Sequence, residues 1–226
     1  MVLQTLFQEC ELGYTFKNDQ VFGFFGNIRA TLSAIEKTFP QFNFSRIKQT
    51  HSDIIVQASP ELKEADAHFS LEKNKALLIA TADCTPVLIY EKFSGTVAAI
   101  HAGWRGVENQ ITVKTLKKMS EANTKTEFEI WIGPHILQKS FEVQKDVLDL
   151  LLKSSYAVNK SKHYLQTGSG FMVDLKGILE SQIEQLQLPI REIHSLDIDT
   201  KIDLRFHSFR RDKAASGRNL SFITKI

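Results

Sequence analysis

The segment ATADCTPVLIYEKFSGTVAAIHAGWRG, residues 80–106, places a cysteine and a histidine at the ends of short apolar runs. The runs 87–90 and 97–100 are rich in Val and Ile and are bounded by Gly and Pro, which predicts buried strands rather than helices. Residues 91–95 between them predict the turn of a hairpin or a short connection. A further apolar run, 77–80, precedes the cysteine and predicts another strand.

Three potential metal ligands are associated with these strands. Cys84 lies 33 residues after His51 and 17 before His101, so the three can meet only if the strands bring them together. Two imidazoles and one thiolate suit zinc or copper, and three protein ligands leave a fourth position for water or substrate. Two alternatives stay open: a buried cysteine with hydrogen-bonded histidines, or a cysteine hydrolase in which His101 activates Cys84.

Length and composition favour one ordinary globular domain over residues 1–226. The net charge is +2, from 28 basic and 26 acidic residues, which argues against nucleic acid or an anionic membrane as a partner. We expect a cytoplasmic protein, because no secretory signal pattern and no apolar run of about 20 residues occurs. Its two cysteines, Cys10 and Cys84, cannot form a disulfide framework.

The rest of the chain mixes strand and helix patterns. A hairpin is expected within residues 1–28, and residues 46–58 contain strand-like alternation around a polar break. Residues 61–75 are expected to form a loop. Helices are expected at 30–39, 108–122, 143–152 and 175–186, and further strands at 128–132, within 190–203 and at 220–226. Since there is no strict βαβ rhythm, the pattern predicts an α+β fold with two packed sheets.

Five motifs carry a family resemblance: KQTHSD at 48–53, ADCTPVL at 82–88, HAGWRG at 101–106, IGPH at 132–135 and RRDKAASGR at 210–218. In these motifs and their order the chain resembles the laccase-domain family. Its members were first called polyphenol oxidoreductases and later described as atypical zinc-dependent purine nucleoside phosphorylases. The resemblance runs over most of the chain, and HAGWRG together with ADCxP is highly specific.

The resemblance implies a fold, a metal site and an activity. It implies a layered α/β/β/α sandwich in which His51, Cys84 and His101 hold Zn²⁺, with Cu²⁺ as the alternative. The implied activity is phosphorolysis of adenosine, inosine, guanosine and S-methyl-5'-thioadenosine, with adenosine deamination beside it. Purine nucleosides and phosphate would be its partners, and the chain a monomer or homodimer. Copper-dependent phenol oxidation is the alternative, although the HxH pairs of multicopper oxidases are absent.

Phosphorolysis requires fixed positive charge for phosphate, which guanidinium groups bind in a bidentate manner. Arg105 in HAGWRG and the C-terminal Arg210, Arg211 and Arg218 are therefore candidates, against the alternative of structural ion pairs. Trp104 could stack on a purine or simply pack in the core.

Three further polar residues are candidates for roles near the metal. Asp83 could orient His101 or His51, or could form an Asx turn. His68, in the expected loop, could shuttle protons at the mouth of the cleft or be a surface histidine.

The third, His135, could be a metal ligand or a cap on the cleft, because the family often has cysteine at this position. The chain also departs from the family by having Asp199-Thr200 where a Cys-Thr pair is frequent, and by lacking a Gly-Gly-Val-Ser turn at 27–33.

Overall fold

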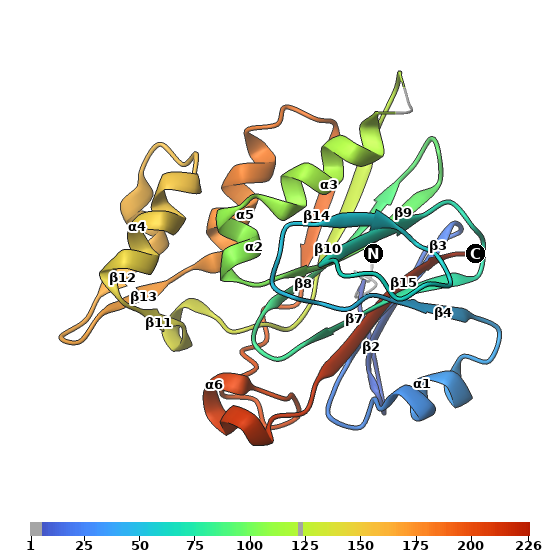
Figure 1. Cartoon of the computed structure of the whole chain (residues 1–226), viewed down its shortest axis with the longest axis horizontal. Coiled ribbons are helices and arrows are strands. Elements are labelled where there is room, and N and C mark those ends of the chain that lie inside the picture. Colours follow the sequence, from blue (N-terminus) through green and yellow to red (C-terminus); the bar gives the residue numbers. More distant parts are fainter. Residues whose placement is uncertain (1–5, 122–123) are drawn as a thin grey trace, which may run out of the picture.

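The computed structural model describes residues 6–121 and 124–226, which form two six-stranded mixed sheets packed face to face (Figure 1). The first sheet comprises, in spatial order, β1 (Gln8–Cys10), β2 (Gly13–Lys17), β3 (Val21–Gly26), β15 (Asn219–Lys225), β7 (Lys75–Thr81) and β4 (Asn43–Arg46). The second comprises β14 (Ile190–Ser195), β10 (Phe128–Ile132), β8 (Thr85–Glu91), β9 (Thr96–Ala102), β6 (Ala67–Ser70) and β5 (Ile55–Gln57). Neighbouring strands are antiparallel except in the pairs β4–β7, β10–β14 and β5–β6.

Alternation along the strands produces three apolar layers. The inward-facing side chains of both sheets form the central layer, where Phe16 of β2 stacks on Trp131 of β10 with ring centroids 4.4 Å apart. The helix α1 (Leu32–Thr38) packs its buried Ile35 on the outer face of the first sheet.

Four helices cover the outer face of the second sheet and extend that layer sideways: α2 (Trp104–Glu108), α3 (Ile111–Ser120), α4 (Lys145–Ser154) and α5 (Leu175–Glu184). The order of layers is therefore helix, sheet, sheet, helix, which confirms the predicted α/β/β/α sandwich.

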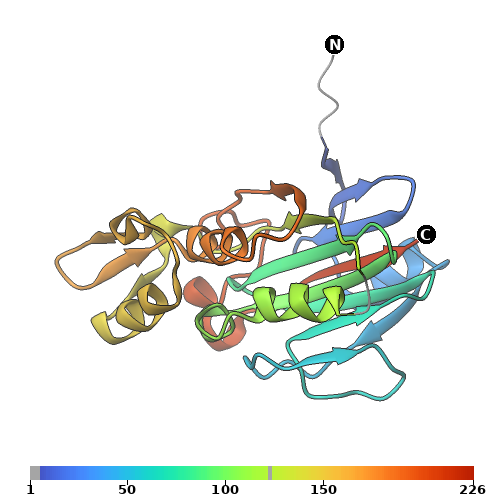
Figure 2. The same ribbon diagram turned by 90° about the horizontal axis from the view of Figure 1, so that it is seen from above.

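A smaller unit projects from one side of the sandwich. It contains a three-stranded sheet of β11 (Glu142–Val143), β13 (Phe171–Val173) and β12 (Tyr164–Gln166), together with α4 and the short 3-10 helices η1 (Gln138–Ser140) and η2 (Lys160–His163). Figure 2 shows this unit extending away from the stacked sheets. Near it lie the last helical turns, α6 (Phe209–Asp212) and η3 (Lys213–Ala215).

Most predicted elements are confirmed. The β8–β9 hairpin pairs Pro86 with His101, and the chain ends in the expected closing strand, β15. The N-terminal hairpin is β2–β3, although residues 1–5 of the predicted range lie outside the described residues.

One expectation was wrong, and two others need adjusted bounds. The expected loop at 61–75 contains β6, which is buried between β5 and β9. In the range 46–58, β4 ends at Arg46 and β5 (Ile55–Gln57) follows the polar break. The expected helix at 108–122 is split by Gln110, whose φ is 59°, and its last expected residue, Ala122, lies outside the described residues. Among the described helices, none is long and apolar enough to cross a membrane.

Candidate metal centre

Strand connections bring the three proposed ligands to one place. The chain leaves the first sheet at the end of β7 and enters the second at the start of β8, so Cys84 lies where it crosses between the sheets. His101 lies near the end of β9, opposite Pro86 in the register of the hairpin. His51 lies in the turn between β4 and β5, in a left-handed conformation with φ of 60°.

The donor atoms of the three side chains converge. One ligand atom from each of His51, Cys84 and His101 lies within 4.8 Å of the others. The Cys84 Sγ is 3.9 Å from the His51 Nε2, and the two imidazole centroids are 4.7 Å apart. His101 is buried, Cys84 is half-buried and His51 is exposed, so the group lies at the edge of the core and opens to one side.

Asp66, immediately before β6, contacts both His101 and the turn that carries His51. Its carboxylate is fully buried and lies 2.7 Å from the Nδ1 of His101. The same carboxylate accepts hydrogen bonds from the backbone N–H groups of Thr50, His51 and Ser52 and from the Ser52 hydroxyl. One buried anion therefore shapes the turn that carries His51 and directs the other ring nitrogen of His101 toward Cys84.

In all three groups, hydrogen bonds shift the pKa in the direction opposite to the shift that burial causes. Burial alone would raise the pKa of the Cys84 thiol, but hydrogen bonds with His101 and His51 lower that pKa to about 6. Burial alone would lower the pKa of His101, but hydrogen bonds with Asp66 and Cys84 raise it to about 9. For Asp66, hydrogen bonds from His101 and Ser52 outweigh burial and hold the carboxyl pKa well below its usual range. The group thus favours a thiolate, which is the form that binds metal.

Gly103 gives the ligands the space they occupy. A Cβ atom at this position would lie 3.0 Å from the Cδ2 of His51 and 3.1 Å from the Sγ of Cys84. Both contacts are closer than ordinary van der Waals separation. The glycine in HAGWRG therefore allows the backbone to approach the metal ligands closely.

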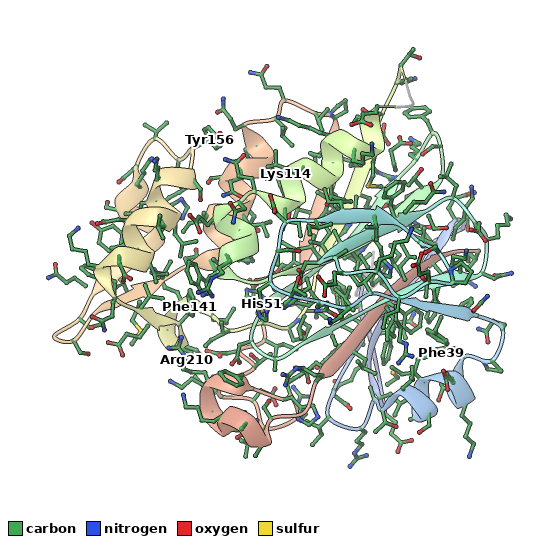
Figure 3. All side chains as sticks on the ribbon, viewed as in Figure 1. Phe39, His51, Lys114, Phe141, Tyr156 and Arg210 are labelled. Carbon is green, nitrogen blue, oxygen red and sulfur yellow. The ribbon has the colours of Figure 1, made fainter. Side chains whose placement is uncertain are left out.

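A cavity of about 620 Å³ adjoins the three ligands. Its lining residues, apart from the ligands, are Gln49, Ala80, Ala82, Asp83, Trp104, Arg105, Ile136, Phe141, Phe209, Arg210, Lys213 and Arg218. These come from the segment between β4 and β5, from the end of β7 and the crossing that follows it, from α2, from the segment between β10 and β11, and from α6 and the chain after it. Figure 3 shows His51, Phe141 and Arg210, which are far apart in the sequence, in the same region of the molecule.

The candidate arginines divide into two groups. Arg105 lines the cavity, and its guanidinium carbon lies 4.3 Å from the centroid of the Trp104 ring. Arg210 and Arg218 also line the cavity and donate hydrogen bonds to backbone carbonyls, Arg210 to that of Glu142. Trp104 is partly buried and lines the cavity, so it packs against the core while presenting one side to the cavity.

Arg211 does not belong to the cavity, which corrects the expectation that it binds phosphate. Its guanidinium donates to the carbonyls of Thr200, Lys201 and Phe206 and forms an ion pair with Asp212. These contacts use its donors to fix the turn before α6. The alternative of a structural ion pair therefore describes Arg211.

Asp83 does not orient either imidazole, so that expectation was wrong. Its carboxylate accepts hydrogen bonds from the Thr200 hydroxyl at 2.8 Å and from the backbone N–H of Arg210 at 2.6 Å. The imidazole of His101 is oriented by Asp66 instead. Asp83 ties the chain beside Cys84 to the C-terminal segment that carries Arg210.

Neither His68 nor His135 lies where its expected role requires. His68 is fully buried on β6 opposite Ala99, which packs between the sheets, and burial lowers the His68 pKa to about 3. It is therefore neither a loop residue nor at the cavity mouth. His135 is buried, outside both the ligand group and the cavity lining, with its Nδ1 2.8 Å from the carbonyl of Gly133. Burial lowers its pKa as well.

Several residues of the site were not identified from the sequence. Asp66 carried a signal, because a lone acidic residue between Ala65 and Ala67 precedes a strand and suggests a buried carboxylate. Gln49 carried none: its side-chain amide both donates to and accepts from the backbone of Ala80. Phe141 and Phe209 are ordinary aromatic residues in sequence, and only the cavity shows their position.

Comparison with known families and proteins shows which sequences this chain is similar to. The sequence model of the family described as multi-copper polyphenol oxidoreductase laccase matches residues 3–225. A purine nucleoside phosphorylase of Clostridium acetobutylicum is 34% identical over 185 residues, which are 79% of this chain and 75% of that protein. One from Bacteroides thetaiotaomicron is 36% identical over 170 residues, which are 74% of this chain and 63% of that protein. The purine nucleoside phosphorylase YfiH of Escherichia coli is 29% identical over 184 residues, 80% and 73% of the two chains.

Solved structures share the fold. The hypothetical protein YfiH of Bacillus licheniformis superposes with a TM-score of 0.80 at 21% identity, covering 90% of this chain and 92% of that one. A protein of Neisseria meningitidis also gives a TM-score of 0.80, at 22% identity and 98% and 99% coverage. At these identities the likeness establishes the architecture and nothing about activity.

Proposed function

The chain belongs to the multi-copper polyphenol oxidoreductase laccase family, and on that premise we propose that it is a zinc-dependent purine nucleoside phosphorylase. The proposed substrates are adenosine, inosine, guanosine and S-methyl-5'-thioadenosine with inorganic phosphate, and adenosine deamination is a proposed side activity. Relatives with the name purine nucleoside phosphorylase, up to 36% identical, support this assignment. The observation that carries it is a three-donor group opening beside a cavity lined with arginines.

The donor set fits a divalent metal. Two imidazoles and a thiol of lowered pKa lie within 4.8 Å of one another, and a buried carboxylate orients one of the imidazoles. His51, Cys84 and His101 would hold the ion, with one position left for a ligand from the cavity. A bound zinc ion would supply Lewis acidity at the wall of the cavity.

Phosphorolysis would then depend on the residues that line the cavity. Arg105 and Arg210 would hold inorganic phosphate, because guanidinium groups pair with phosphate oxygens. One phosphate oxygen forms a bond to C1' of the sugar as the bond from C1' to the purine N9 breaks. The purine leaves with the electron pair and takes up a proton, while fixed positive charge stabilises the phosphate in place.

The aromatic residues of the cavity would bind the base. Trp104, Phe141 and Phe209 all line it, and Phe209 is 52% exposed, so a planar ligand could cover it. In deamination, water would add to C6 of adenine and ammonia would leave. The same bound base would serve both reactions.

One assay tests the proposal directly. Adenosine is incubated with the purified full chain, with and without inorganic phosphate, and adenine and inosine are followed by chromatography. We expect adenine only when phosphate is present, and a smaller amount of inosine that is independent of phosphate. Cys84→Ala should abolish both products, whereas Cys10→Ala, at the other, exposed free cysteine, should leave them unchanged. Full phosphate-dependent turnover by Cys84→Ala would contradict the proposal.

The same preparations distinguish the two alternatives. Elemental analysis of protein purified without an affinity tag should give one zinc ion per chain. Oxygen uptake with a phenol in proportion to bound copper would instead favour the copper oxidase. A cysteine hydrolase would be favoured if Cys84 in the protein as isolated reacts rapidly with an alkylating reagent and the protein's hydrolytic activity disappears as it does so.

A further inference from the structure

The cavity contains more positive charge than an uncharged nucleoside requires. Arg105, Arg210, Lys213 and Arg218 all line it. Its one carboxylate, that of Asp83, is already engaged by Thr200 and the backbone of Arg210. Within residues 6–121 and 124–226, none of these four cations forms an ion pair with a carboxylate. Arg29, Arg205 and Arg211, elsewhere in the same range, all do.

These cations come from two separate elements. Arg105 belongs to α2, which follows the metal ligand His101, and it rests on Trp104. The others belong to α6 and the chain after it, which Figure 1 shows apart from α2. Arg210 is half-buried and its backbone is tied to Asp83 beside Cys84, whereas Lys213 and Arg218 are exposed. Lys213 and Arg218 therefore form an outer pair of cations, which we name the rim pair.

Lys213 occupies this position at a cost in backbone conformation. Its φ is 53° and its ψ is −131°, a combination that glycine adopts readily and side chains with a Cβ adopt rarely. Six non-glycine residues of the described chain have positive φ, and three of them, His51, Asp83 and Lys213, line the cavity. Strain of this kind concentrates where function requires a particular side chain. A lysine in a backbone conformation that favours glycine indicates a role for its ammonium group.

We propose that the rim pair, Lys213 and Arg218, binds a phosphate group carried by the substrate, so that the enzyme accepts purine nucleoside 5'-monophosphates. The inference rests on the proposed function and extends its substrate class. Arg105 and Arg210 remain the residues for inorganic phosphate. In phosphorolysis of adenosine 5'-monophosphate, an oxygen of inorganic phosphate forms the bond to C1' as the C1'–N9 bond breaks. Adenine leaves with the electron pair and gains a proton, and ribose 1,5-bisphosphate is the other product.

Equilibrium binding tests the rim pair independently of turnover. Calorimetry of the full chain at low salt, without inorganic phosphate, compares adenosine 5'-monophosphate with adenosine. We expect the monophosphate to bind about tenfold more tightly, because two cations meet one dianion at a partly exposed site. Equal affinities would overturn the proposal. Since no reaction is measured, the result is informative even if the chain proves not to be a phosphorylase.

Variants at one position separate charge from conformation. Lys213→Gln and Lys213→Gly should lose most of the preference for the monophosphate, whereas Lys213→Arg should keep it. Lys213→Gly should also raise the melting temperature, by roughly 2–4 °C, because it relieves the positive φ. A Lys213→Gln protein that keeps the preference, or a Lys213→Arg protein that loses it, would contradict the role of the ammonium group. Lys117→Gln, at an exposed lysine on α3, is the control for total charge.

A competition arm identifies the source of the phosphate. With millimolar inorganic phosphate present, the preference for the monophosphate should persist, because the two phosphates occupy different cations. If inorganic phosphate abolishes the preference, the rim pair belongs to the co-substrate site and the proposed 5'-phosphate subsite is wrong.

Discussion

The cavity has two walls of opposite character. We call the first the ligand wall: His51, Cys84 and His101, with Asp66 behind them. The second is the cation wall: Arg210, Lys213 and Arg218, on α6 and the chain that follows. The ligand wall is attached to strands of both sheets and is held by a fully buried carboxylate with several donors. In the cation wall, Arg210 lies on a four-residue helix without a single buried residue, and Lys213 and Arg218 lie on the chain after that helix.

The two walls differ in how rigidly the fold holds their side chains. A metal ion tolerates little error in the position of its ligands, so His101 lies on a central strand, and His51 and Cys84 lie in short connections held between strands of the two sheets. Phosphate recognition by long cationic side chains tolerates more, and short surface segments can supply it. Two buried carboxylates beside the site hold different walls. Asp66 contacts His101 of the ligand wall, and Asp83 accepts a hydrogen bond from the backbone of Arg210 in the cation wall. The following predictions test the distinction, starting with the largest effect.

Replacing Asp66 should damage the ligand wall most. Asp66→Ala leaves His101 and the N–H groups of residues 50–52 without their acceptor inside the core. We expect a loss of about 3–5 kcal/mol in the free energy of unfolding, measured in urea, and of about 10–100-fold in zinc affinity. Glu64→Ala, at an exposed carboxylate paired with Lys48, should cost less than about 1 kcal/mol. Similar losses of unfolding free energy in the two variants would show that the ligand wall is not held more rigidly than the surface.

Acid should destabilise the sheets behind the ligand wall through His68. Because burial lowers its pKa to about 3, the unfolded chain binds more protons than the folded chain between that pH and about 6.5. Its contribution to stability is therefore present above about 6.5 and is lost as the pH falls, by up to about 1.4 kcal/mol per pH unit. His68→Leu should flatten the dependence of unfolding free energy on pH in that window and leave its slope between pH 7.5 and 8.5 unchanged. An unaltered slope in the acid window would show that His68 is not held neutral.

A single methyl group should weaken the metal site without unfolding the chain. Gly103→Ala places a Cβ against His51 and Cys84, so zinc affinity should fall, on the order of tenfold. Its φ of −71° is ordinary for alanine, and the melting temperature should change little. Gly106→Ala is the matched control, because its Cβ would meet a methyl group of Ile111 at 3.2 Å and the backbone oxygens of Ser52 and His101 at 3.6 and 3.7 Å, rather than the metal-binding side chains. Equal zinc affinity in both variants would contradict the close approach at Gly103.

The smallest effect should follow from loosening the cation wall. Asp83→Ala removes the acceptor for Thr200 and for the backbone of Arg210, so the KM for phosphate should rise several-fold, on the order of 1 kcal/mol. Zinc content should stay unchanged, because Asp83 contacts neither imidazole through its carboxylate. Asp83→Asn should recover most of the activity, since one amide can accept from Arg210 and donate to the hydroxyl of Thr200. Loss of zinc from Asp83→Ala would assign the residue to the ligand wall instead.

The sequence predicted much of the sandwich because its signals are local. The runs 87–90 and 97–100 gave the β8–β9 hairpin, and the alternation near Phe16 and Phe24 gave β2–β3. The polar segment 61–75 misled, because β6 is only four residues long and carries a buried histidine. A short strand with a polar residue has no periodicity to distinguish it from a loop.

The chain's own order of residues was enough to identify the layered α+β architecture, the three candidate ligands and the family, because these depend on apolar periodicity and on short motifs. It did not reveal which carboxylate, Asp66 or Asp83, reaches His101, or that Arg210 lines the cavity while Arg211 does not. Those contacts follow from the crossing of the chain between the two sheets and from the register of β6 on β9. Only the tertiary structure decides them, since each joins groups far apart in sequence and no local pattern encodes such a distance.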